Sequence, residues 1–437
     1  MPDFAIALPE ELNYSQVLPS LPSGVQALEQ YLLPVNGASF TTSAGGNLVQ
    51  FDLPARGFLV PNSLYIRYFY TITNAAGMVS QMLGTPVYAP IQRLETIFGS
   101  STVESINNYN QNMNLLTNLQ LTIAQKYGKQ NAYGWGNNTA TPTMDTLDGR
   151  TCVTNETGSF AAPLWGLLAN SEKFVPLGMM PNVRIQLTLD RITNFFQQNN
   201  LLPLTPNFQE SPSQFTITNF ELCYTMLDFG SAVEGMIKNM GESIVLKSQS
   251  FTNSSNTVSI AATGYQELIF SQRLASIKSF FVLCPITGTT PTNGMFDSFD
   301  ITKGGDYQIG LAGKYYPSKP INTALNKSAV YMELTKAVGA VSASHSFSVN
   351  TIEFNRVAGV ATTLVEPAKF FLGVNMELLP DSKNTLLTGV STQNSTISVR
   401  MNVASATAAT STAITLISLY DALIEINPTE RSAIVRQ

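Results

Sequence analysis

The chain has 437 residues, enough for two or three domains, but only 12% of them are Asp, Glu, Lys or Arg, and the formal net charge is −5. That is about half of the roughly 25% that soluble domains carry. The sequence has no basic run, which excludes binding of nucleic acid by phosphate neutralisation. It has no uninterrupted apolar stretch of about 18 residues, which excludes a membrane-spanning helix. Its 10% aromatic residues exclude a disordered chain.

Residues 1–45 are expected to form an N-terminal arm. Pro9, Pro19 and Pro22 interrupt the segment, and its first twelve residues hold three acidic residues and no Lys or Arg, which excludes a signal peptide. Val25, Leu28 and Leu32 are spaced as on one face of a helix and predict a short helical stretch. The arm is expected either to pack on its own chain or to contact a neighbouring subunit.

Residues 46–230 are expected to form a first β-domain of short strands. Alternating apolar residues and many Tyr and β-branched residues are typical of half-buried strands. Apolar residues at helical spacing predict one helix over 106–128, with Gly128 as its C-terminal stop. Residues 129–156 have no period and predict a long surface loop. Strands are predicted at 47–54, 64–73, 91–98, 159–168, 182–191 and 215–229.

A linker over 231–244 precedes a second β-domain over 245–437. The same order of features restarts there, with a helical segment over 321–341 and a tail after Asn427. Strands are predicted at 257–262, 267–270, 275–284, 306–317, 369–380, 395–403 and 411–426.

The two halves repeat one pattern. The strand at 64–73 corresponds in place to that at 275–284, an offset of about 210 residues, and the last strands of the halves are offset by about 198. Sequence identity between the halves is slight, so the repeat rests on order and pattern. The predicted fold is all-β, with two tandem eight-stranded jelly-roll sandwiches and a few short helices in loops.

An ordered set of segments resembles the double jelly-roll major capsid proteins of tailless icosahedral DNA viruses. The resemblance is nearest to the polinton-like virus and virophage branch, and more distant to adenovirus hexon and the large eukaryotic DNA viruses. Each segment is a strand with its turn and none is a catalytic signature. The segments that carry the resemblance are FDLPARGFLVPNSLYIRYFYTIT (51–73), FVPLGMMPNVRIQLTLDR (174–191), YQIGLAGKYYPSKPI (307–321), FFLGVNMELLP (370–380) and LLTGVSTQNSTISVRM (386–401).

The resemblance implies a structural protein without catalysis or cofactor. Three copies would supply six jelly-roll wedges to a pseudo-hexagonal homotrimeric capsomer that tiles an icosahedral shell. The implied partners are neighbouring capsomers, penton and minor capsid proteins, without direct binding of nucleic acid, and the implied location is the virion, assembled inside the host cell. The resemblance leaves open whether an internal membrane lies beneath the shell. Low charge suits such a role, because charged residues are depleted in interface cores.

Reactive residues are scarce. His345 is the only histidine, so a nucleophile–histidine triad has one candidate base, and a loop histidine without a role is the preferred interpretation. Gly389 opens a segment like a nucleophile elbow, but Gln393 replaces its second glycine. Lys314 follows a glycine as in a phosphate loop, but Tyr315 stands where Ser or Thr would bind magnesium, so this segment is interpreted as a turn.

Carboxylates and cysteines give no metal site. Asp297, Asp300 and Asp306 lie close in sequence, but their spacing does not match an EF-hand and a solvated turn is preferred. The three cysteines are far apart and odd in number, which predicts small core residues and neither a disulfide framework nor a zinc site. Catalytic, cofactor-binding and metal-binding residues are therefore all predicted to be absent.

Two alternatives stay open. Tyr65, Tyr68, Phe69 and Tyr70 offer an aromatic platform for a trimeric carbohydrate- or receptor-binding β-sandwich, such as a viral spike or a lectin-like module. Strand alternation instead sends Tyr68 and Tyr70 to one face and Tyr65 and Phe69 to the other, which favours core or interface positions. A glycoside hydrolase would need a pair of carboxylates, and no pair stands out.

Overall fold

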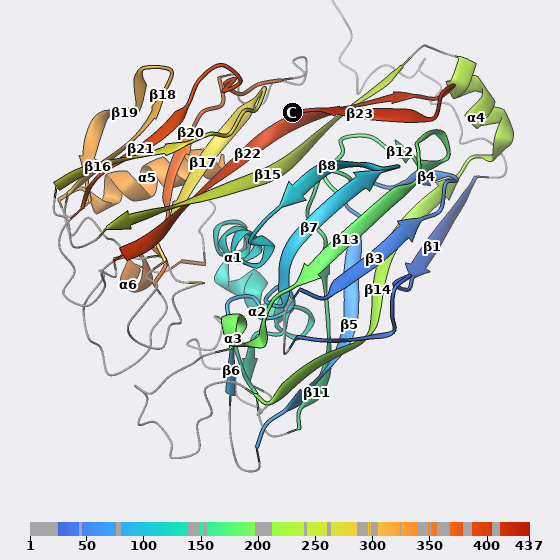
Figure 1. The fold of residues 1–437 in the computed structure, drawn as a ribbon, viewed down its shortest axis with the longest axis horizontal. Coiled ribbons are helices and arrows are strands. Elements are labelled where there is room, and N and C mark those ends of the chain that lie inside the picture. The colour runs from blue at the N-terminus through green and yellow to red at the C-terminus, as the bar shows by residue number, and fades with distance from the viewer. Residues whose placement is uncertain are drawn as a thin grey trace, which may run out of the picture.

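The computed structural model shows two β-sandwiches side by side along the longest axis of the molecule, the first on the right and the second on the left of Figure 1. The residues that it describes are 25–42, 46–75, 80–137, 149–152, 155–196, 212–239, 243–259, 264–285, Phe296, Ser298, 305–323, 325–339, 348–349, 351–355, 368–378, 387–403 and 411–437.

The first sandwich has two main antiparallel sheets. One sheet contains, side by side, β1 (Gln26–Leu32), β14 (Gln214–Asp228), β5 (Tyr65–Thr73) and β11 (Thr157–Pro163). The other contains β3 (Leu48–Leu53), β13 (Val183–Leu189), β7 (Ile91–Phe98) and β8 (Ser101–Ile106). Shorter strands extend this half: β2 (Ser39–Thr41), β4 (Phe58–Leu59), β6 (Ser80–Leu83), β9 (Gly136–Asn137), β10 (Gly149–Cys152) and β12 (Val175–Pro176).

The second sandwich repeats this arrangement. Its first sheet contains β15 (Ile244–Ser259), β22 (Ser411–Asn427), β17 (Ile277–Leu283) and β20 (Leu372–Asn375), with β23 (Ser432–Arg436) also paired to β22. Its second sheet contains β16 (Gly264–Phe270), β21 (Ile397–Val403), β18 (Asp306–Leu311) and β19 (Lys314–Asn322).

The two halves match strand for strand. Numbered along the chain, the main strands of each half pair in the order first, eighth, third, sixth in one sheet and second, seventh, fourth, fifth in the other. This is the order of a jelly roll, so the prediction of two tandem eight-stranded jelly rolls is confirmed among the described residues. The predicted correspondence also holds, because β5 pairs with β14 as β17 pairs with β22, each with one register shift.

Helices are few and lie mostly between strands that lead from one sheet to the other. They are α1 (Tyr109–Gln120), α2 (Ile123–Tyr133), α3 (Ile192–Phe195), α4 (Gly230–Asn239), α5 (Lys327–Val338), α6 (Thr351–Phe354) and a 3-10 turn over Leu177–Met179. Helices α1 and α2 connect β8 to the strands before β11, and α5 follows β19, so both halves carry a helix after their fifth strand.

Strand alternation builds the cores. In β13 every second side chain, from Val183 to Leu189, is buried, and in β5 the side chains of Ile66, Tyr68 and Tyr70 are at most 1% exposed. The Tyr68 hydroxyl donates a hydrogen bond to the Val87 carbonyl at 2.8 Å, which satisfies the polar tip of a ring that is otherwise surrounded by apolar atoms.

The predicted helix around Val25 is wrong. Residues Gln26–Leu32 form β1, which pairs antiparallel with β14 from Gln26 opposite Asp228 to Leu32 opposite Leu222. The interstrand hydrogen bonds of a ready sheet edge override a short helical spacing, since an isolated helix of this length is marginal in water. Part of the predicted arm therefore belongs to a sheet of the first jelly roll, and residues 1–24 lie outside the described residues.

The single helix predicted over 106–128 is two helices. The first ends at Gln120 with Leu121 as its C-cap, and Thr122 caps the second. The Thr122 hydroxyl accepts a hydrogen bond from the Gln125 amide at 3.2 Å, and the Gln125 side chain accepts one from the Thr122 amide at 2.9 Å. Gly128 lies inside α2 and is not its stop. The C-terminal cap is Gly134, whose φ of 87° is readily adopted only by glycine.

Other local predictions also need correction. The segment 129–156, predicted as a surface loop, contains the end of α2 and the strands β9 and β10, with Trp135 and Cys152 buried. The segment 306–317 is a hairpin, with Ala312 and Gly313 at positive φ between β18 and β19. The linker contains α4, and the tail contains β23.

Close packing of α5 on β20 depends on Gly373. A Cβ built there would lie 2.9 Å from the Leu334 Cα and 3.0 Å from the Ala337 Cβ of α5. We expect Gly373→Ala to lower the free energy of unfolding by about 1–3 kcal/mol, because the helix must move off the sheet. Gly235→Ala in α4 is the matched control: nothing lies within 4 Å of its Cβ, so helix propensity should give a gain of about 0.5–1 kcal/mol. Urea unfolding measures both, and a harmless Gly373→Ala would contradict the packing argument.

Candidate functional site

Most of the residues weighed for catalysis or metal binding lie where the structure gives no description. His345, Asp297 and Asp300 lie outside the described residues. Asp306 begins β18, and its carboxylate accepts a hydrogen bond from the Tyr265 hydroxyl at 3.0 Å. In the part of the chain that the structure describes, no group of three or more His, Cys, Asp or Glu side chains is arranged to hold a metal ion.

The two motif-like segments are structural. The Gly389 amide donates a hydrogen bond to the Ser276 hydroxyl at 2.9 Å, and Val390 forms a β-bridge with Ile277, so this segment begins alongside β17 and the predicted turn follows only at 393–394. At the other segment the turn is Ala312–Gly313, and Lys314 with the two tyrosines after it begins β19. The prediction of a turn at Lys314 is therefore displaced by two residues.

The aromatic run of β5 follows the predicted alternation. Tyr68 and Tyr70 are buried in the core, where both rings pack against Phe160, while Phe69 is 47% exposed and Tyr65 is half-buried on the opposite face. All three cysteines are buried thiols, and burial raises the pKa of the Cys152 thiol. They are core residues, as predicted, and not reactive thiols.

Buried polar groups gather where the two jelly rolls meet. Glu104 on β8 is 3% exposed, and its carboxylate accepts hydrogen bonds from the Thr96 hydroxyl at 2.7 Å, the Leu167 amide at 2.8 Å and the Ser250 hydroxyl. Ser250 belongs to β15 of the second half, so this carboxylate joins the halves directly. Burial raises the pKa of Glu104, against the lowering effect of its hydrogen bonds.

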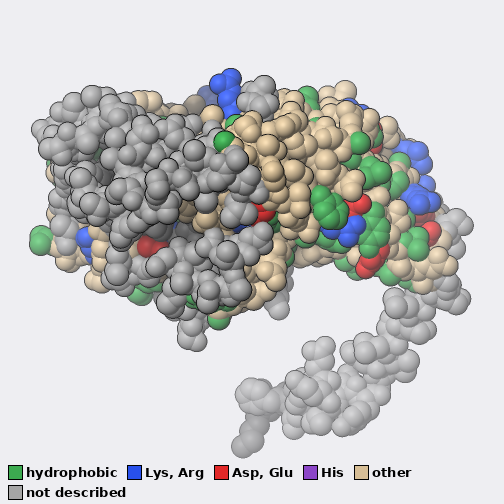
Figure 2. Space-filling view, turned by 90° about the horizontal axis from the view of Figure 1, so that it is seen from below, with side chains coloured by type: hydrophobic (Ala, Val, Ile, Leu, Met, Phe, Trp, Pro, Cys, Tyr) green, Lys and Arg blue, Asp and Glu red, His purple; other side chains and the backbone are tan. Residues whose placement is uncertain are grey.

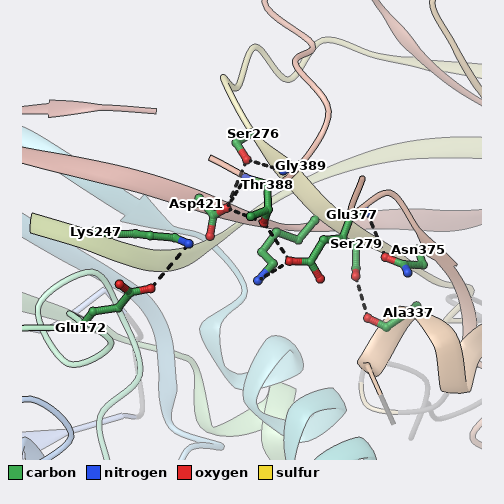
Figure 3. Close-up of polar contacts among 11 residues, drawn as sticks. Glu172, Lys247, Ser276, Ser279, Ala337, Asn375, Glu377, Thr388, Gly389 and Asp421 are labelled. Atoms are coloured by element: carbon green, nitrogen blue, oxygen red, sulfur yellow. Dashed lines mark hydrogen bonds and ion pairs between the residues drawn. The ribbon is translucent and has the colours of Figure 1, made fainter. Parts of the chain in front are cut away.

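The long strand β15 lies along the first half over several further contacts. The Ser248 hydroxyl donates to the Leu167 carbonyl, the Asn170 side-chain amide donates to the Gln249 carbonyl at 3.1 Å, and the Trp165 and Phe251 rings pack with centroids 5.8 Å apart. At the border the Lys247 ammonium lies 3.5 Å from the Glu172 carboxylate (Figure 3). Together with Glu104 we call these contacts of β15 with the first half the seam.

Helix α1 is the second part of the boundary between the halves, and in Figure 1 it lies between the two sandwiches. Most of its polar side chains are buried, and two hydrogen bonds link it to the second half: the Asn114 side-chain amide donates to the Phe296 carbonyl at 3.2 Å, and the Ser348 hydroxyl donates to the Asn118 backbone carbonyl at 3.0 Å. The Asn118 side-chain oxygen also accepts a bond from the buried Lys126 ammonium at 2.6 Å. A helix buried by both halves fixes their relative position.

A cavity of 290 Å³ remains beside α1, between Leu116 and Leu119 of the first half and Phe251 and Phe281 of the second. Two of its polar lining residues are paired with each other: the Lys278 ammonium lies 3.0 Å from the Glu377 carboxylate. That carboxylate also accepts a hydrogen bond from the Thr388 hydroxyl at 2.8 Å (Figure 3).

A second, apolar cavity of 480 Å³ lies beneath α4. Phe58, Phe174, Phe229 and Ile237 are among its lining residues, and Phe174 is 45% exposed at its rim. Its charged lining residues are Glu172 and Lys173, and the Glu172 carboxylate lies 3.5 Å from the Lys247 ammonium.

The exposed surface carries little charge. Figure 2 shows one face on which charged side chains form small scattered groups between uncharged polar atoms. Exposed ion pairs such as Arg184 with Asp52, at 2.6 Å, contribute at most about 1 kcal/mol each. Large apolar side chains are nevertheless exposed at both ends of the molecule, including Tyr31, Leu33 and Leu325. No helix in the described part of the chain is long and apolar enough to cross a membrane.

The structure therefore places together residues that join two domains, and no catalytic set among the residues it describes. Sequence reasoning missed Glu104, which accepts three hydrogen bonds in the seam. A lone acid between the strand predicted at 91–98 and the helix predicted over 106–128 was the only available signal, and β8 itself was not predicted. The sequence also did not show that the exposed apolar residues at each end of the molecule lie near one another, because they come from separate segments of the chain.

Comparisons with known proteins give a likeness of fold only. No family model and no curated protein matches the sequence. A chain of the Sputnik virophage is similar, with a TM-score of 0.60 and 13% identity over 99% of this chain and 93% of that chain. A chain of the PBCV-1 virus capsid gives 0.58 and 12% over 94% and 97%, and the mavirus major capsid protein gives 0.55 and 12% over 99% and 95%. This chain thus has the double jelly-roll fold of those proteins over nearly its whole length.

Proposed function

We propose that this chain is a major capsid protein, three copies of which associate into a pseudo-hexagonal capsomer of an icosahedral viral shell. The observation that carries the proposal is the strand-for-strand repeat of one sandwich in two rigidly joined halves. Two wedges per chain let three chains present six similar wedges, and hexagonal blocks tile a curved lattice whose five-fold vertices another protein fills.

Three further features support this role. Buried polar bonds at Glu104 and along α1 fix the angle between the wedges, as a building block requires. No group of His, Cys, Asp or Glu side chains in the described part of the chain is arranged to hold a metal ion. The fold is shared with the mavirus protein, which is named as a major capsid protein.

The remaining partners belong to the same proposal. Neighbouring capsomers, penton and minor capsid proteins are the proposed contacts, and the virion is the proposed location. With a net charge of −5 the subunit is not proposed to hold the genome.

Light scattering coupled to size-exclusion chromatography tests the assembly. We expect the purified protein at micromolar concentration to have three times the 47.4 kDa mass of one chain. Negative-stain microscopy of the same fractions should show particles with a hexagonal outline, because three chains present six similar wedges, joined by obligate interfaces that commonly bury about 2,000 Å² or more. A stable single chain would contradict the proposal.

A further inference from the structure

The cavity beneath α4 has the size and lining of a small-molecule site. Cavities that hold small ligands enclose about 300–1,000 Å³ and are mostly apolar, with a few polar groups that orient the ligand. This cavity measures 480 Å³, and its described lining residues are all apolar except Glu172 and Lys173. An apolar cavity offers water few hydrogen bonds and binds an apolar molecule instead.

The floor of the cavity belongs to the two sandwiches. Phe58 lies on β4, which pairs with β12 and β14 of the first half, and Leu246 lies on β15 of the second half. Both side chains are buried, and the Phe58 ring meets the Phe229 ring edge to face, with centroids 5.2 Å apart. Paired strands and packed rings hold this floor in place, so the site is formed before a ligand arrives.

The roof is α4, which joins the last strand of the first half to the first strand of the second, at the upper right of Figure 1. None of its described side chains is buried: Met236 is 59% exposed, and Ile237, which lines the cavity, is only half-buried. A surface helix normally packs its apolar side against a core. Here the cavity occupies the space of those contacts, and a bound apolar molecule would supply them.

The charges at the mouth favour an anionic head group. Glu172 is compensated by Lys247, whose ammonium lies 3.5 Å from its carboxylate. Lys173 is exposed and has no ion-pair partner among the described residues. It stands beside Phe174, which is 45% exposed at the rim, so a cation and an apolar surface meet at the entrance. That combination fits an amphiphile with an anionic end.

We propose that the cavity beneath α4 binds one long-chain fatty acid, with its alkyl chain between the helix and the apolar floor and its carboxylate at the mouth beside Lys173. The occupant has a single chain because 480 Å³ lies in the lower half of the range for small ligands. Each subunit forms this site by itself, so the inference goes beyond the proposed function and does not depend on assembly.

Titration calorimetry of the wild-type protein, after an apolar resin has removed any lipid purified with it, tests the ligand class. Octanoate, decanoate and dodecanoate should each bind once per chain, and each added methylene should tighten the binding about four-fold. Dodecanoate should bind several-fold more tightly than dodecylammonium, which has the same alkyl chain and the opposite charge. Affinity that is independent of chain length would contradict an apolar site.

Two pairs of variants locate the head group and the alkyl chain. Lys173→Glu should weaken dodecanoate and strengthen dodecylammonium at low salt, each several-fold, because the charge at the mouth is reversed. Lys319→Glu, on exposed β19, changes the net charge equally and should alter neither. Ile237→Trp should weaken dodecanoate about ten-fold or more by filling the cavity. Met236→Trp, on the same helix but outside the lining, should not.

Hydrogen exchange of the wild type decides the location even if a variant fails to fold. Dodecanoate should slow exchange of the α4 amides, because the ligand holds the helix against its floor. Slowing confined to other segments, or unchanged affinity in a folded Ile237→Trp variant, would overturn the site. Unchanged selectivity in Lys173→Glu would overturn the assigned head group. The mass measured by light scattering tests assembly separately, so failure of either proposal leaves the other standing.

Discussion

Replacing Glu104 by Ala should lower the free energy of unfolding by roughly 3–5 kcal/mol, more than any surface substitution of comparable size. The change removes an acceptor that serves the Thr96 hydroxyl, the Leu167 amide and the Ser250 hydroxyl, all in a site where the carboxylate is 3% exposed. Each buried donor left without an acceptor costs about 1–3 kcal/mol. Urea unfolding at a fixed protein concentration measures the loss.

Glu104→Gln is the matched control. Its amide oxygen replaces the Oε1 atom that accepts from Leu167, and its NH₂ group donates to the Thr96 hydroxyl, so the shape and most of the bonds remain. We expect it to keep most of the stability that Ala loses. If Ala and Gln were equally stable, the carboxylate would not hold the seam.

Comparison of the wild type with the Glu104→Gln variant over pH also has a definite sign. Burial raises the pKa of Glu104 above its ordinary value of 4.5, so the folded protein binds its proton more tightly than the unfolded chain does. The wild type therefore has its highest free energy of unfolding, relative to Glu104→Gln, below the ordinary pKa of 4.5. That advantage falls as the pH rises through the raised pKa of Glu104 in the folded protein. In thermal melts between about pH 4 and pH 8, the melting temperature of the wild type should fall relative to that of Glu104→Gln as the pH rises.

Strands with alternating burial were predictable from the sequence. In β13 the side chains of Val183, Ile185, Leu187 and Leu189 face the core and those between them face outward, so the strand itself contains the whole signal. The last strand of each half was found in the same way. The double jelly roll followed because such local signals recur in the same order in both halves.

The error at β1 has a geometric cause. Leu28 and Leu32 are four residues apart, and that spacing places two side chains on one face of a helix and also on one face of a strand. Both leucines do share one half-buried face, but of a strand, because β14 offers a partner about 190 residues away in sequence. No local window contains that partner.

The seam and the exposed apolar surfaces were beyond sequence reasoning for the same reason. Glu104 meets groups from residues 96, 167 and 250, and Tyr31 meets Arg67 only after two strands pair with β14. An isolated glutamate and an isolated tyrosine have many possible surroundings. Their roles become definite only when the sheets are assembled.

The second large effect is expected at Asn118 in α1. Its side-chain oxygen accepts a hydrogen bond at 2.6 Å from the ammonium group of Lys126, which is 2% exposed and lies 5.4 Å from the centroid of the Trp135 ring. Asn118→Leu replaces that acceptor by apolar atoms, and a hydrogen bond to a charged group contributes about 1.5–3 kcal/mol. We expect a loss of roughly 2–4 kcal/mol in urea unfolding.

Two companion variants identify the ammonium group as the cause. Asn118→Asp keeps an oxygen at the same position and adds a charge opposite to that of Lys126, so it should lose less than Asn118→Leu. Adding Lys126→Met to Asn118→Leu removes the buried charge itself, and the double variant should be more stable than Asn118→Leu alone, because replacing both members of a buried polar pair by apolar groups is close to neutral. A double variant no more stable than Asn118→Leu would mean that the loss arises from the packing of α1 between the halves, since the ammonium group would then be indifferent to its acceptor.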